Sequence, residues 1–196
     1  MKLLSHKTVR SAGLGALTLL AGAAQAHTGH DTSSMLAGLV HPFGLDHLLV
    51  MVAVGMWSVA ALPAQRRWLG PLTFVGAMVL AAGLGALGVT LPFTEHAVAL
   101  SLAVLGAMLV AGQRLGCVSG LALVALAATF HGLAHGAELP SGGLFAGYAI
   151  GFVATTAALH MAGVGVGVAL RHTSAWVWRV LGAALGATSL MLLSQV

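Results

Sequence analysis

Two short segments of the chain each bring together several residues that can bind a metal ion. One reads HPFGLDH and the other reads FHGLAHGAE. Their imidazoles and carboxylates are His41, Asp46, His47, His131, His135 and Glu138. Imidazole suits zinc, copper and nickel, and carboxylates compensate the charge of the ion. Because no cysteine lies near either segment, the ligand set favours a divalent borderline ion over Cu(I), without choosing among such ions.

The spacing in the second segment places its ligands on one helix face. His131 and His135 are four residues apart, so their side chains are neighbours on a helix. Glu138 extends this face if the helix continues past Gly136. Two histidines at this spacing are a familiar pair of metal ligands. The alternative is a histidine pair that is simply solvated at a membrane surface.

The first segment needs a bend in the backbone to bring its histidines together. His41 and His47 would lie about 240° apart around an unbroken helix. Pro42 and Gly44 favour a bend between them. The alternative, in which Pro42 begins a helix and His41 caps it, leaves Asp46 beside His47 unexplained.

His160 is a further candidate, in the apolar run TTAALHMAG. Thr156 precedes it by one helical turn and can hydrogen-bond its ring. Such a histidine is either a structural residue with satisfied hydrogen bonds or a stepping stone for an ion. Ionisable residues inside membrane spans are usually functional, which favours the second interpretation.

The composition indicates that lipid surrounds these residues. The chain has 196 residues, of which 59% are hydrophobic and only 6% are charged, against roughly 25% charged in a soluble domain. The few basic residues form no patch with interleaved aromatics, which excludes a nucleic-acid partner. A single cysteine, Cys117, excludes an internal disulfide.

The first 26 residues have the pattern of a signal peptide that is cleaved after Ala26. Basic residues precede the short apolar run AGLGALTLLAGAA, and a small-x-small site follows it. An uncleaved first helix is the alternative. Cleavage would leave residues 27–35 as a periplasmic N-terminus containing His27 and His30, which either captures a divalent metal or is a polar leader.

Six apolar segments follow, and they predict an all-α membrane protein with its transport domain in residues 36–196. The expected spans are about 36–61, 69–91, 96–112, 115–135, 143–170 and 176–194. Their many glycines are expected to let helices approach closely, because small residues mediate helix packing in lipid.

The arginines between the spans predict the orientation of the chain. They fall only in the first, third and fifth connections: Arg66, Arg67, Arg114, Arg171 and Arg179. The second and fourth connections carry Glu95 and Glu138 instead. Because basic loops face the cytoplasm, we expect both mature termini on the opposite side. The two histidine segments then lie at one depth near the outer face, and His160 lies deeper.

The two motifs together resemble those of the HupE/UreJ family of nickel transporters. HPFGLDH with the following LLVMVAVGMW is similar to the first family motif, and FHGLAHGAE is similar to the second. The likeness covers the signal, the six spans and the histidine-bearing start. The first motif has one residue fewer between Pro42 and Gly44 than the usual His-Pro-x-x-Gly-x-Asp-His, a spacing that resembles the signature of the nickel/cobalt transporter family.

The resemblance implies a non-enzymatic secondary transporter that takes up nickel, or cobalt, through the bacterial inner membrane. The ion would be cargo and not a permanent cofactor. Its uptake would serve hydrogenase or urease, with the lipid bilayer and a homo-oligomer as further partners. The positions that the resemblance assigns to metal handling are His41, Asp46, His47, His131 and Glu138, with His135 at a matching place.

Two other classes of function remain open at this point. One is a membrane hydrolase or a haem-binding redox protein, although the sequence contains no His-Glu-x-x-His motif. The other is an assembly subunit of a metalloenzyme, which leaves the carboxylates beside the histidines unexplained. No Walker motif is present, so ATP does not drive the chain directly.

Overall fold

The computed structural model describes residues 34–138 and 144–196, which fold into helices joined by short connections. The predicted signal peptide, His27 and His30 lie outside the described residues. The helices in chain order are α2 (Ser34–Val40), η1 (His41–Phe43), α3 (Leu45–Ala61), η2 (Ala64–Arg66), α4 (Leu69–Ala86), α5 (Thr94–Ala111), η3 (Gly112–Arg114), α6 (Cys117–Ala137), α7 (Phe145–Leu170) and α8 (Ala175–Leu193).

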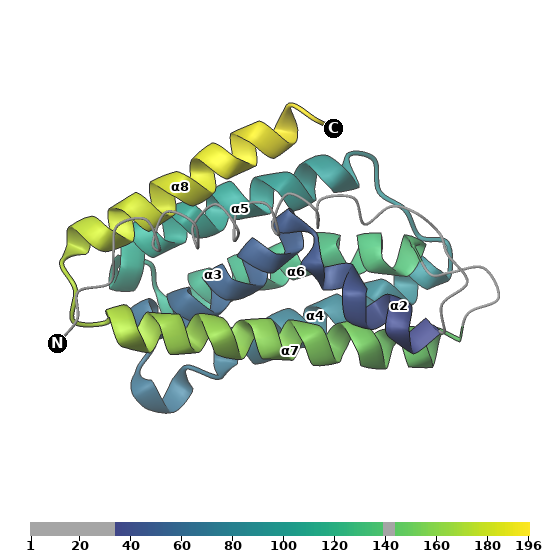
Figure 1. The fold of residues 1–196 in the computed structure, drawn as a ribbon, viewed down its shortest axis with the longest axis horizontal. Coiled ribbons are helices and arrows are strands. Elements are labelled where there is room, and N and C mark those ends of the chain that lie inside the picture. Colours follow the sequence, from purple (N-terminus) through teal and green to yellow (C-terminus); the bar gives the residue numbers. More distant parts are fainter. Residues whose placement is uncertain (1–33, 139–143) are drawn as a thin grey trace, which may run out of the picture.

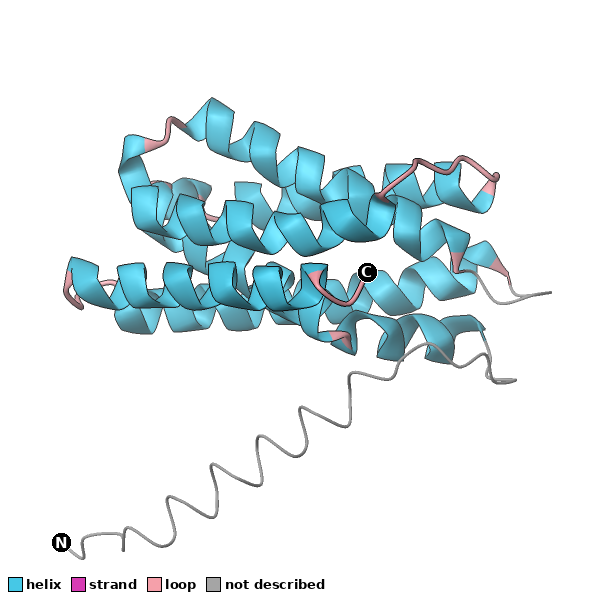
Figure 2. Ribbon diagram, turned by 90° about the horizontal axis from the view of Figure 1, so that it is seen from above, coloured by secondary structure: helices cyan, strands magenta, loops and turns pink. Residues whose placement is uncertain are grey.

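Five helices are long and apolar enough to cross a membrane: α4, α5, α6, α7 and α8. The bent pair of α2 and α3 makes a sixth span if it is counted as one. The expected all-helical, multi-pass membrane fold is therefore confirmed, whereas the count of six depends on this broken span. The described connecting loops lie mostly at the two ends of the bundle (Figure 2).

The second span ends earlier than the hydropathy predicts, at Ala86 instead of about residue 91. Gly88 adopts a φ of 89°, a left-handed conformation that glycine reaches without strain. Val89 N–H then donates to the Leu84 carbonyl at 3.1 Å, and Gly88 N–H donates to that of Gly85 at 2.9 Å. These two bonds form a Schellman motif, which ends the helix although the following residues remain apolar.

The helices pack in pairs, with α4 against α6, α5 against α8, and both α2 and α3 against α7. Glycines allow part of this close packing. A Cβ on Gly132 would collide with the Met78 carbonyl, and one on Gly163 would collide with the Val52 carbonyl. Gly83 and Gly165 face open space, so the expected role of the glycines holds at selected positions only.

The first span is broken where the sequence predicts a bend. α2 and α3 meet at 78°, partway along the bundle (Figure 1). Pro42 lies in the first turn of the 3-10 helix η1, and Gly44 takes the extended conformation φ −52°, ψ 141° before α3 begins. Irregular backbone within a membrane is tolerated only where protein or a cavity surrounds it. The break is therefore a candidate position for a binding site.

Candidate metal site

The bend in the first span and the C-terminal part of α6 bring three histidines together. The ring centroids of His41 and His135 are 4.4 Å apart, those of His47 and His135 are 4.9 Å apart, and those of His41 and His47 are 5.4 Å apart. One ring nitrogen of each residue lies within 4.8 Å of those of the other two. We call His41, His47 and His135 the three-histidine cluster. Its nitrogens are close enough to share one metal ion.

His47 and His135 are buried and His41 is half-buried, and the hydrogen-bonding capacity of the cluster is only partly used. His135 is fully buried, and neither of its ring nitrogens has a hydrogen-bond partner among the described residues. The Nε2 atom of His47 is likewise buried without a partner. A buried polar atom left unsatisfied costs about 1–3 kcal/mol. A bound cation would use these lone pairs and remove that cost.

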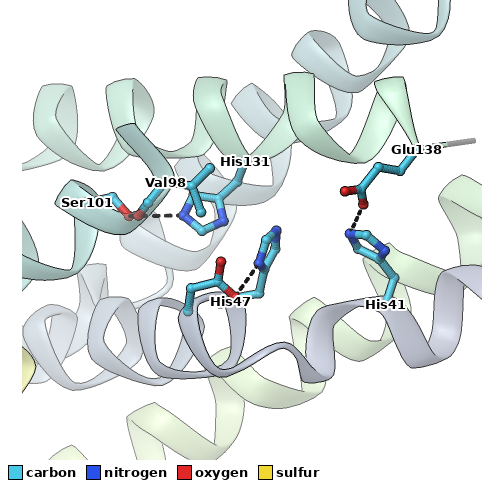
Figure 3. A network of polar contacts seen from close by, with 7 residues as sticks. His41, His47, Val98, Ser101, His131 and Glu138 are labelled. Atoms are coloured by element: carbon cyan, nitrogen blue, oxygen red, sulfur yellow. Dashed lines mark hydrogen bonds and ion pairs between the residues drawn. The ribbon is translucent and has the colours of Figure 1, made fainter. Parts of the chain in front are cut away.

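Asp46 holds the His47 ring with this lone pair free. Its Oδ1 atom lies 2.8 Å from His47 Nδ1 and also accepts the His47 backbone N–H at 2.8 Å (Figure 3). Because an ionised carboxylate only accepts hydrogen bonds, the imidazole proton resides on Nδ1 and the lone pair on Nε2. Carboxylate–histidine pairs orient metal ligands in this way in many sites.

Glu138 performs a comparable task for His41 at the end of α6. The helix ends at Ala137, and Glu138 is its C-cap residue. The Glu138 carboxylate lies 2.9 Å from His41 Nε2 (Figure 3). This contact joins the broken first span to α6. With the His41 ring neutral and its proton on Nε2, facing the carboxylate, Nδ1 carries the lone pair. The predicted helix therefore continues past Gly136, and Glu138 follows directly after its last residue.

Ser101 on α5 fixes the orientation of His131. The Ser101 hydroxyl donates to the Val98 carbonyl at 2.6 Å and lies 3.0 Å from His131 Nε2 (Figure 3). Because its proton is engaged, the hydroxyl accepts from His131 Nε2–H. The lone pair then sits on Nδ1, which is buried without a partner. The His131 ring is 4.6 Å from that of His47, next to the cluster.

His160 lies apart from these residues. Its Nδ1 donates to the backbone carbonyl of Thr156 at 2.8 Å. The predicted hydrogen bond between these two residues is therefore present. The buried Nε2 of His160 has no partner among the described residues. The Phe74 ring is 5.1 Å from His160 and 5.6 Å from His131. The ring of Phe74 is therefore a neighbour of both His160 and His131.

A cavity of about 370 Å³ leads to the cluster, with His41 and His47 in its wall. All three carboxylates of the described residues, Asp46, Glu95 and Glu138, also line it. A cleft lined by one sign of charge concentrates ions of the opposite sign. Glu95 and Ser101 were not predicted as site residues. Their only signals in the sequence are an acidic residue in a short connection and a single serine in an apolar run.

The fold and site together define a class: a multi-pass helical membrane protein with buried imidazoles behind an acidic cavity. The family model described as HupE / UreJ protein matches residues 15–192. Protein HupE of Rhizobium leguminosarum bv. viciae is 40% identical over 173 residues, which cover 87% of this chain and 90% of that protein. No solved structure matches. The chain therefore belongs to the HupE/UreJ family.

Proposed function

We propose that this protein carries divalent nickel, and secondarily cobalt, across the bacterial inner membrane through the three-histidine cluster. The observation that supports this most is the set of buried imidazole nitrogens without partners at His47 and His135. Neutral imidazole is a good ligand for nickel and cobalt. The choice of nickel among such ions rests on the family resemblance, which also links the cargo to hydrogenase or urease.

The first step of this proposal is capture of the hydrated ion at the acidic cavity. The carboxylates of Asp46, Glu95 and Glu138 attract the cation. The imidazoles of the cluster then replace its water ligands. His41 and Glu138 come from two different spans and contact each other in the cavity wall. An arriving cation would replace this contact with contacts to itself.

The second step passes the ion deeper by exchange of ligands. His47 contacts both His135 and His131, so it can hold the ion while one partner replaces the other. His160 is the next imidazole, beyond Phe74. A movement of the Phe74 side chain would connect the two sites, and its present position would hold the ion at the outer one.

The direction of transport follows from the arginine-bearing connections. With these in the cytoplasm, the acidic cavity opens to the periplasm, where both mature termini also lie. A membrane potential then favours the inward movement of a dication by about 4.6 kcal/mol per 100 mV. This driving force suffices for uptake without ATP, either in a channel-like manner or coupled to protons.

Uptake of labelled nickel into cells without other nickel importers tests the proposal. We expect accumulation by the wild type and background values for His47→Ala and His135→Ala. His96→Gln is the matched control, because His96 lies at the same end with its ring against Phe93 and not in the cluster. Equal accumulation in all four proteins, at equal membrane levels by immunoblot, would refute transport through the cluster.

The purified protein separates transport from the redox alternative. We expect it to bind nickel in a His135-dependent manner and to show no Soret band. A Soret band that disappears in His47→Ala would instead identify a haem site. Competition by cobalt and zinc in the uptake assay then defines the selectivity.

A further inference from the structure

A second cavity, of about 550 Å³, lies at the opposite end of the bundle and is basic. Its charged and titratable lining residues are Arg67, Arg114, Arg171, His172 and Arg179. They come from the first, third and fifth connections and from the start of α8. Four arginines that are far apart in the sequence thus line one cavity.

These arginines have no acidic partner in the described part of the chain. Its three carboxylates, Asp46, Glu95 and Glu138, all line the other cavity. The Nε atom of Arg67 is buried without a hydrogen-bond partner among the described residues. Arg171 Nε donates only to its neighbour, His172 Nε2, at 2.9 Å. Four cations that share one hollow repel each other, so an external anion would stabilise this end.

The remaining wall of the cavity is apolar. Val59, Leu109, Val110 and Trp178 contribute to it. Trp68, which caps the start of α4, and Trp176, in the first turn of α8, are 57% and 65% exposed. Tryptophan is enriched where membrane helices meet the lipid headgroups. The cavity therefore lies at headgroup depth, with a charged part and an apolar part.

We propose that this cavity binds the phosphate of an acidic phospholipid, with phosphatidylglycerol as the simplest example. Guanidinium groups match phosphate oxygens with two parallel hydrogen bonds. The apolar wall would contact the glycerol and the first carbons of the acyl chains. A free phosphate would use the arginines but gain nothing from Leu109, Val110 and Trp178. Basic pockets between membrane helices bind anionic headgroups in other proteins.

The chain offers an internal control for this proposal. Arg66 and Arg67 are adjacent and carry the same charge, but only Arg67 lines the cavity. A general attraction of basic loops to acidic lipid would depend on both residues equally. Of these two residues, binding at a defined site would depend only on Arg67.

Native mass spectrometry of the full-length, delipidated protein in detergent provides the test. The probes are phosphatidylglycerol, phosphatidylcholine and excess inorganic phosphate. We expect retention of phosphatidylglycerol over phosphatidylcholine, and a loss of about tenfold or more in retention for Arg67→Gln and Arg114→Gln. Arg66→Gln should retain the lipid as the wild type does, and Arg67→Lys should fall between.

Three results would overturn the proposal. One is equal retention of the two lipids by the wild type. Another is an equal loss in Arg66→Gln and Arg67→Gln. The third is displacement of the lipid by inorganic phosphate at comparable concentration, which would identify a free-anion site. Arg67→Lys keeps the charge, so monodisperse Arg67→Lys with reduced retention distinguishes a lost contact from a misfolded protein.

Discussion

The two ends of this bundle differ in the sign of the charge that each gathers into a cavity. One cavity is lined by the carboxylates of Asp46, Glu95 and Glu138, with buried imidazoles behind them. The other is lined by four of the five arginines of the described residues. Seven of the eight charged side chains of the described residues are thus divided between the two cavities by sign.

This contrast connects orientation with chemistry. Under the positive-inside rule the arginines are expected to orient the chain, and they also line the basic cavity that we propose binds an anion. The carboxylates make the opposite end attractive to a cation, next to the three-histidine cluster. We propose that the same separation of charge serves both insertion and binding. Substitutions at one end should then leave binding at the other end unchanged.

The largest effect is expected at the centre of the cluster. His135→Ala removes a ligand with no other hydrogen-bond partner among the described residues. We expect its nickel affinity to fall by more than the roughly 10–100-fold that loss of an orienting partner costs. Isothermal titration of the purified protein measures this. His96→Gln should bind as the wild type does, and an unaltered affinity in His135→Ala would remove the cluster from the account.

The carboxylate of Asp46 should come next. Asp46→Asn keeps the size of the side chain but replaces the acceptor of the His47 Nδ1 proton with an amide. The ring then loses its fixed orientation, and we expect nickel affinity to fall by about 10–100-fold. Glu95→Gln is the comparison, because Glu95 lines the same cavity but forms no hydrogen bond or ion pair with the three histidines. If the two variants lose the same affinity, Asp46 acts through its charge alone.

Substitution of His160 is expected to affect nickel transport but not nickel binding. His160 is not part of the three-histidine cluster, and Phe74 lies beside both it and His131. We therefore expect His160→Ala to leave the equilibrium affinity for nickel unchanged and to slow uptake. Titration and labelled-nickel uptake are compared on the same variant. Normal uptake would show that His160 is a structural residue, held by its bond to the Thr156 carbonyl.

A smaller effect is expected from Ser101→Ala. The change removes one hydrogen bond to His131 and leaves the ring free to turn. At about 1 kcal/mol for such a bond, nickel affinity or uptake should fall about fivefold. Ser101→Thr restores the hydroxyl and should recover most of it. A Thr variant that behaves like the Ala variant would point to packing in α5 instead.

The pH dependence sharpens the contrast between the ends. Protons and nickel compete for the same imidazole lone pairs, so nickel binding should weaken as the pH falls. Guanidinium groups stay protonated throughout this range, so retention of phosphatidylglycerol at the other end should not change. Parallel measurements at several pH values test both statements. Nickel binding that strengthens on acidification would contradict ligation by imidazole.

Part of this site could be predicted from the sequence because covalent geometry sets it. Pro42 and Gly44 indicate the bend, and the four-residue spacing places His131 and His135 on one face. The alternation of basic and acidic connections indicates that the two motifs meet. These inferences depend on local rules, and the structure brings the side chains together as they require.

The remaining residues depend on how each helix is rotated, which the sequence does not reveal. α4 and α5 are apolar on all sides, so nothing marks Phe74 or Ser101 as facing the histidines. The sequence groups Asp46 with the metal ligands, and it does not reveal the contact between Asp46 and His47 Nδ1, from which we propose a positioning role. The early end of α4 at Gly88 follows from a local capping motif that hydropathy does not detect.

X-ray absorption at the nickel edge of the nickel-loaded, purified protein tests the central claim most directly. For the wild type we expect nitrogen ligands to nickel, with the outer-shell scattering of several imidazole rings. That scattering should decrease in His135→Gln and persist in His96→Gln. Nickel surrounded by oxygen alone in the wild type, or a spectrum unaffected by His135→Gln, would contradict a metal site built from His41, His47 and His135.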